Sequence, residues 1–236
     1  LLPLNFFTMA KKHPSKKYKA ALEKIDQEKL YDIKEASSLA IETSVTKFDS
    51  SVEIHINLSV DVKHADQIVR GTLVLPHGTG KTPRIAAFTE ADKEKEAKDA
   101  GADLVGLDNL IAEVSKGNID FDIAVAEPAV MKNLGKIAKN LGTKGLMPSP
   151  KAGTVTPDIV KAITEIKKGK VEYKTDKNGL IHCMIGKVSF GADKIEENAK
   201  MLLDAILAAK PSAVKGKYIN SISLASTMGP GVSVEY

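Results

Sequence analysis

The stretch best equipped for chemistry in this sequence runs from Ile219 to Gly231 and reads INSISLASTMGPG. In a strand, alternation places Ile222, Leu224 and Ser226 on one face. The other face carries only small side chains: Ser221, Ser223, Ala225 and Thr227. Hydroxyl groups both donate and accept hydrogen bonds, and small side chains let another backbone come close. This face therefore suits the 2′-hydroxyls and phosphates of a folded RNA. The alternative is an edge strand whose Ser and Thr side chains face solvent.

Lysine supplies nearly all of the positive charge. The chain has a net charge of +4, and among its 34 basic residues only Arg70 and Arg84 are arginines. Lysine binds phosphate as a point charge, whereas arginine is better suited to reading base edges. Five lysines lie in and before the loop 142–154, which is rich in proline and glycine: Lys132, Lys136, Lys139, Lys144 and Lys151. We interpret them as a surface that contacts a nucleic-acid backbone, with a plain solvated face as the alternative.

Other kinds of site find little support. The stretch 77–82 (HGTGKT) is similar to part of a nucleotide-binding loop, but Leu75 stands where that pattern needs glycine, and Pro83 follows where a helix should begin. Cys183 is the single cysteine, and the five histidines lack metal-ligand spacing. No apolar run approaches the length of a membrane span. We predict no enzyme activity, metal, cofactor, small-molecule substrate or membrane partner.

Two patterns of secondary structure divide the chain. Near the N-terminus we expect helices over 18–25 and 33–46 and strands over 52–60 and 70–75. From residue 84 strands and helices alternate: strands 84–88, 103–107 and 122–126, and helices 89–100, 108–116, 129–141 and 156–168. After Gly169 we expect strands 171–174 and 180–186 joined as a hairpin, a helix over 193–209, and strands 219–228 and 232–235.

This order predicts an α/β protein of two domains. Residues 1–77 and 170–236 form a split α+β domain built from both chain termini. Residues 78–169 form an inserted Rossmann-like, three-layer α/β domain with a small parallel sheet. The two crossings between the domains, at Pro76-His77-Gly78 and at Gly169, predict a hinge.

The N-terminal residues and the cysteine content also carry expectations. Met9-Ala10-Lys11-Lys12 is typical of a protein start, so we expect residues 1–8 to be upstream sequence. One cysteine without a partner fits a reducing, cytoplasmic setting.

Four motifs, in order, resemble a single family. They are KFD at Lys47–Asp49, RGTLVLPHGTGK at Arg70–Lys81, GLMPSPKAGT at Gly145–Thr154 and STMGP at Ser226–Pro230. Together they resemble the L-one family of large-subunit ribosomal proteins in its bacterial form, from about Lys16 to the C-terminus.

The resemblance implies a non-enzymatic protein of the 50S subunit with the split first domain described above. Such a protein binds the three-way junction of the 23S rRNA stalk region beside the E site and assists release of the deacylated E-site tRNA. Many family members also repress translation of their own operon mRNA through a similar RNA fold. The inserted domain would contact rRNA or tRNA more loosely through its lysines.

The resemblance also implies which residues bind rRNA and mRNA. These are Lys47, Phe48, Ser221, Thr227, Met228 and Gly229, together with Asp176, Lys177 and His182 in the hairpin. The family commonly has arginines where this chain has Tyr173 and Lys174, which would weaken the salt-resistant part of binding. The rival interpretations are a small enzyme built on the inserted domain and a free-standing translational repressor.

Overall fold

The computed structural model describes residues 15–64 and 66–236, so the expected upstream segment 1–8 lies outside the described residues. The helices are α1 (Lys16–Leu22), α2 (Ile33–Glu42), α3 (Glu94–Asp99), α4 (Asp108–Ser115), α5 (Met131–Leu134), α6 (Ala138–Thr143), α7 (Ile159–Lys167) and α8 (Ala192–Ala208). The strands are β1 (Ser51–Leu58), β2 (Arg70–Val74), β3 (Ile85–Phe88), β4 (Leu104–Val105), β5 (Ile123–Ala126), β6 (Lys170–Lys174), β7 (Leu180–Lys187), β8 (Ile219–Ser226) and β9 (Gly231–Val234). No helix within these residues is long and apolar enough to cross a bilayer.

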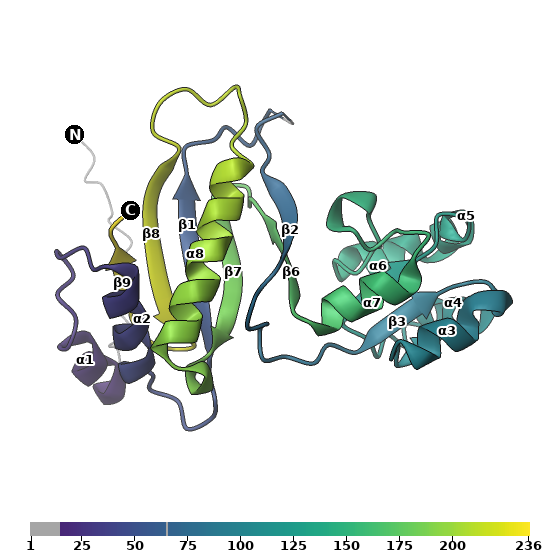
Figure 1. Cartoon of the computed structure of the whole chain (residues 1–236), viewed down its shortest axis with the longest axis horizontal. Coiled ribbons are helices and arrows are strands. Elements are labelled where there is room, and N and C mark those ends of the chain that lie inside the picture. The colour runs from purple at the N-terminus through teal and green to yellow at the C-terminus, as the bar shows by residue number, and fades with distance from the viewer. Residues whose placement is uncertain (1–14, 65) are drawn as a thin grey trace, which may run out of the picture.

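The two ends of the chain form one antiparallel sheet, with strand order β7-β1-β8-β9. Its central strand β1 comes from the N-terminal part and pairs on both sides with C-terminal strands. Every second residue of β1 is buried, as its alternating sequence predicts. Helices α2 and α8 cover this buried face (Figure 1). The split α+β architecture predicted from the sequence is therefore confirmed.

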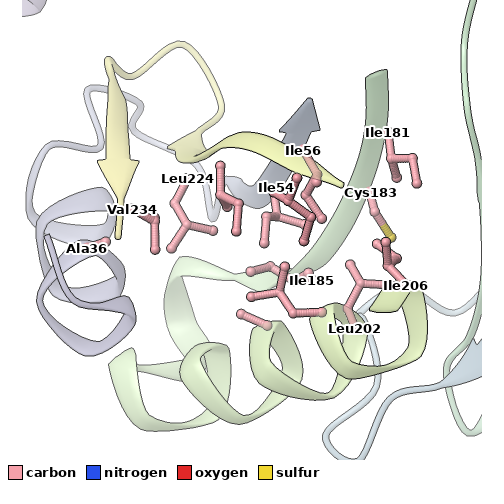
Figure 2. Close-up of a cluster of buried hydrophobic side chains, with 14 of the residues drawn as sticks. Ala36, Ile54, Ile56, Ile181, Cys183, Ile185, Leu202, Ile206, Leu224 and Val234 are labelled. Atoms are coloured by element: carbon pink, nitrogen blue, oxygen red, sulfur yellow. The ribbon is translucent and has the colours of Figure 1, made fainter. Parts of the chain in front are cut away.

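Aliphatic side chains fill the space between this sheet and its two helices. Ile54, Ile56, Ile185 and Leu224 extend from the strands toward Leu202 and Ile206 of α8 and Ala36 of α2 (Figure 2). Cys183 lies in the same cluster, and burial raises its pKa to about 12. The thiol is thus a small apolar core group, as its position between two isoleucines indicates.

A second, three-stranded parallel sheet has the order β4-β3-β5. The strand β3 is buried on both faces, which explains its continuous apolar sequence. Helices α3 and α7 pack against one face, through Ile85, Ala87 and Val125, and helices α4, α5 and α6 pack against the other, through Phe88 and Ala126. The predicted three-layer α/β unit with a small parallel sheet is confirmed.

Several element boundaries differ from the expectation. The helix expected over 33–46 ends at Glu42, where the Thr43 hydroxyl donates to the Leu39 carbonyl at 2.6 Å. The helix expected over 129–141 is broken by a 3-10 turn at Gly135–Ile137, since glycine is a poor helix former. The helix expected over 89–100 begins later: Thr89 is buried just after β3, a 3-10 turn spans Ala91–Lys93, and α3 starts at Glu94.

The predicted hairpin is correct in its turn but not in its pairing. The Asp176–Gly179 turn forms, yet beyond an isolated bridge at Thr175 and Ile181 the strands separate, because β6 pairs with β2 and β7 pairs with β1. The resulting two-stranded ribbon β2–β6 carries both chain crossings between the two sheets (Figure 1).

The predicted hinge residues meet where the two crossings pass each other. Gly78 has φ +64° and Gly169 has φ +98°, and a Cβ on Gly169 would collide with the Cα of Gly78. The division into residues 1–77 with 170–236 and residues 78–169 remains a prediction. At this predicted hinge the two backbones touch with no side chain between them, and glycine at both positions permits that approach.

One buried side chain ties the first crossing to the core. Asn198 of α8 is fully buried, and its Nδ2 donates to the carbonyls of Gly78 at 3.0 Å and Ile185 at 2.7 Å. Its Oδ1 accepts from the His77 backbone N–H at 3.2 Å. The amide therefore satisfies three backbone groups from two separate segments.

We expect Asn198→Ala to lower the free energy of unfolding by about 3 kcal/mol, because it leaves buried backbone groups unpaired. Urea unfolding followed by circular dichroism measures this, and proteolysis at residues 76–81 should become faster. The matched control is Lys194→Ala on the exposed side of the same helix, which should change stability by less than about 0.5 kcal/mol. Equal unfolding curves for the two variants would contradict this role of Asn198.

Candidate nucleic-acid interface

The side of the first sheet away from α2 and α8 presents small polar side chains. We call it the open face, and define it by Ser51, Glu53, His55 and Asn57 of β1, His182 and Met184 of β7, and Ser221, Ser223, Ala225 and Thr227 at β8. All of these side chains are exposed or half-buried in the described part of the chain. Ile222, Leu224 and Ser226 are buried, so the predicted division of this strand into two faces is correct.

At one end of the open face β1 begins and β8 ends. The Thr227 backbone N–H donates to the Ser51 carbonyl at 2.9 Å, and the Ser51 N–H donates to the Thr227 hydroxyl at 3.1 Å. These bonds bring the loop before β1 and the turn after β8 to the same end of the sheet. Lys47, Phe48, Thr227, Met228 and Gly229, which were predicted from separate parts of the sequence, are thereby brought together.

Two large apolar side chains at this end lie in solvent. Phe48 is 64% exposed and Met228 is 74% exposed, the highest values among the large hydrophobic residues that the structure describes. Exposure of this kind costs hydrophobic free energy, so side chains held out of the core in this way are candidates for contact with a partner.

The turn that carries Met228 is strained. The Gly229 N–H donates to the Ser226 carbonyl at 2.8 Å, which closes a turn over Ser226–Gly229. Met228 occupies its third position with φ +65°, the one residue other than glycine with positive φ in the described chain. A side chain in this left-handed region costs roughly 1 kcal/mol, and glycine would avoid that cost. Such strain is typical of functional sites.

Gly229 is required where it stands. A Cβ at this position would run into the Ser226 hydroxyl and would lie 3.3 Å from the Thr43 carbonyl. The Ser226 Oγ is itself buried and has no hydrogen-bond partner within the described chain. The turn is thus packed closely onto the end of α2, and its glycine permits that approach.

The loop before β1 is held by its own polar contacts. The Asp49 carboxylate accepts from the Ser189 N–H at 3.0 Å and from the Ser189 hydroxyl at 2.9 Å. These two bonds, and the nearby Lys187, keep the pKa of Asp49 below its usual value. The Thr46 hydroxyl donates to the Phe48 carbonyl at 3.0 Å. Phe48 is therefore displayed on an anchored loop.

The opposite end of the open face carries Ser221, Asp176 and Lys177. Ser221 pairs with Asn57, and the Leu58 N–H donates to the Gly179 carbonyl at 3.0 Å, which docks the Asp176–Gly179 turn against β1. Asp176 accepts backbone hydrogen bonds from Leu180 and Asn178, each at 2.8 Å. The Leu180 bond is the main cause of its lowered pKa. The two ends are roughly 23 Å apart along β1, and His182 lies between them.

The five predicted lysines of the inserted unit lie elsewhere. All five are exposed, on α5, the following 3-10 turn, α6 and the 144–151 loop, and none is ion-paired within the described chain. They are carried by the unit built on the parallel sheet, separate from the open face. The structure therefore has two candidate surfaces, one mostly uncharged and one rich in lysine.

Sequence reasoning missed two residues of interest. His55 lies on the open face directly opposite His182 and Ser223. The alternation of residues 52–60 predicted that His55 lies on the solvent-facing side of a strand, but it did not predict which strands lie on either side. Asn198 gave no signal, because an asparagine in an amphipathic helix looks the same whether or not it bonds to a distant loop.

Comparison with known proteins places the chain in a family. The model of the ribosomal protein L1p/L10e family matches residues 40–230. The chain is 52% identical over 221 residues to the large ribosomal subunit protein uL1 of Mycobacteroides abscessus, covering 94% of each chain. It is 54% identical over 223 residues to the protein of that name from Mycoplasma capricolum, covering 94% of this chain and 98% of that one. The protein belongs to the ribosomal protein L1p/L10e family.

Proposed function

We propose that this protein is a structural constituent of the large ribosomal subunit, located in the cytoplasm with the ribosome, and that it holds 23S rRNA of the stalk region on its open face. The family is structural rather than enzymatic. Both relatives are large-subunit proteins that match almost the full chain. The strained turn that displays Met228, at the same end of the sheet as exposed Phe48, is the observation that carries the assignment of the open face.

The chemistry of the open face supports recognition of RNA shape. Hydroxyls of Ser221 and Ser223, close-packed Gly229 and exposed Phe48 and Met228 can contact sugar edges and stack on bases without reading a base sequence. Charge is low here, and acidic Glu53 and Asp176 offset the positive charge of Lys47 and Lys177. One such face can serve two RNAs of similar fold, so we extend the proposal to repression of the protein's own operon mRNA.

The lysine surface supports a second, looser contact. Exposed lysines on helices and loops bind phosphates without sequence preference, and their contribution falls with salt concentration. We propose that Lys132, Lys136, Lys139, Lys144 and Lys151 contact E-site tRNA or rRNA backbone and assist release of the deacylated tRNA. The glycine crossing at Gly78 and Gly169 would let this surface move relative to the open face.

A structural constituent should sediment with the large subunit. In a sucrose gradient of cell lysate, we expect the full-length protein in the 50S and 70S fractions and little at the top. A free-standing repressor would instead stay near the top, away from ribosomes, and that distribution would overturn the assignment as a subunit constituent.

Met228→Gly should separate RNA binding from stability. It relieves the positive-φ strain, so we expect the free energy of unfolding to stay the same or to rise by up to about 1 kcal/mol. Loss of the exposed side chain should weaken binding to a stalk-region 23S rRNA fragment by about 1–3 kcal/mol. Gel-shift titration and urea unfolding of the same preparation measure the two effects.

The matched control for this prediction is Met201→Ala, on the exposed side of α8. It removes another solvent-facing methionine, from the side of the fold away from the open face, and should leave RNA affinity unchanged. Thr227→Val is a less clean test, because the Thr227 hydroxyl also bonds to the backbone of Ser51. Wild-type affinity for Met228→Gly would count against the proposed face.

A triple variant in which Lys132, Lys136 and Lys139 are each replaced by glutamate tests the lysine surface. The triple variant should bind the isolated rRNA fragment within about twofold of wild type, since these residues are outside the open face. Ribosomes carrying it should release deacylated tRNA more slowly in a filter-binding chase. If isolated rRNA binding is lost instead, the main RNA contact lies on the inserted unit.

A further inference from the structure

Two histidines face each other in the middle of the open face. His55 of β1 and His182 of β7 are direct cross-strand partners. Their Nδ1 atoms are 2.9 Å apart, and the ring centroids lie 5.0 Å apart in an edge-to-face arrangement. His182 is exposed and His55 is half-buried, so the pair lies at the surface of the sheet.

The contact limits how much positive charge the pair can hold. An N–H···N bond needs one Nδ1 that donates and one that accepts. One extra proton can enter the pair with this bond intact, but a second would place two donors against each other and break it. A further proton therefore becomes favourable when an anion is present to receive the freed N–H groups.

The surroundings of the pair contain few competing charges. Glu53, on the same strand, raises the pKa of His55, but burial and the charge of His182 outweigh it and leave that pKa below its ordinary value. Asp176, at the start of the β6–β7 turn, interacts electrostatically with His182. Across β8 the partner of His55 is the neutral Ser223, and Met184 follows on β7. Helices α2 and α8 pack on the opposite face of the sheet.

We propose that His55 and His182 form a proton-linked phosphate contact of the RNA face. This inference rests on the proposed function. An RNA that reaches from the Met228 end to the Lys177 end must lie over the row His182–His55–Ser223 between them. A phosphate above this row accepts hydrogen bonds from the imidazoles and stabilises their charged form, so docking takes up a proton.

The sign of the effect follows from linkage. Bound RNA raises the proton affinity of the pair, so binding strengthens as pH falls through the range in which the bound pair gains its proton. The gain levels off once the free pair is also protonated. Uptake of one proton corresponds to at most about a tenfold change in affinity per pH unit.

The experiment is a gel-shift titration of the full-length protein with a stalk-region 23S rRNA fragment at constant ionic strength, from about pH 7.5 to about pH 6. We expect wild type to bind about tenfold more tightly at the lower pH. His55→Asn, His182→Asn and the double variant should show a flatter profile. Calorimetric titration in two buffers of different ionisation enthalpy should show proton uptake for wild type and less for the variants.

The matched control is His77→Gln, which removes a histidine that bonds to Glu197 on α8 rather than one on the open face. It should keep the wild-type pH profile. Profiles of wild type and the double variant that run parallel, with folded protein by circular dichroism, would overturn the proposal.

The proposal and the function on which it rests fail in different ways. If wild type binds the fragment, Met228→Gly weakens it and the pH profiles are parallel, the open face stands and the histidine contact falls. If wild type does not bind the fragment at any pH, both are rejected.

Discussion

Pairing of β1 with strands from the far end of the chain is the constraint on which the rest of the structure depends. The bonds between Ser51 and Thr227 join residues 176 positions apart. They align the loop that carries Phe48 with the turn that carries Met228. Because side chains alternate along a strand, a shift of one residue in this register would turn the hydroxyl row into the core and expose the isoleucines. The buried cluster shown in Figure 2 therefore maintains the open face as well as the fold.

The open face combines close packing with low charge. Gly229 rests against Ser226 and the end of α2, and Met228 is held in a left-handed conformation that costs stability. The fold offsets this cost through the core beneath it. Under the proposed function, such rigidity would reduce the entropy lost when a folded RNA binds, whereas a surface of flexible lysines would depend more on salt-sensitive attraction. The lysine-rich unit on the parallel sheet has that second character.

The connection between the two units consists of two chain crossings that meet at a pair of glycines. Two glycines touch where the crossings pass, so no side chain separates the two backbones at that point. On one side of this point Asn198 holds the backbone of His77 and Gly78 against the core through three hydrogen bonds. If the predicted hinge lies here, this attachment up to residue 78 would confine bending to the short stretch that follows it.

Local sequence patterns determined much of this protein. The alternation in 52–60 and 219–226, the helix–strand order of 84–168 and the turn at Asp176–Gly179 all reflect interactions between near neighbours in the chain, and they predicted the fold class and the two faces of β8. The family motifs named most of the residues at the candidate site. Tertiary structure alone decided that β6 pairs with β2 instead of β7, that His55 meets His182, and that Asn198 bonds to the backbone of His77 and Gly78. Those outcomes depend on which distant segments pair with each other. Burial and hydrogen bonding across the whole core determine that pairing, and no local sequence pattern contains this information.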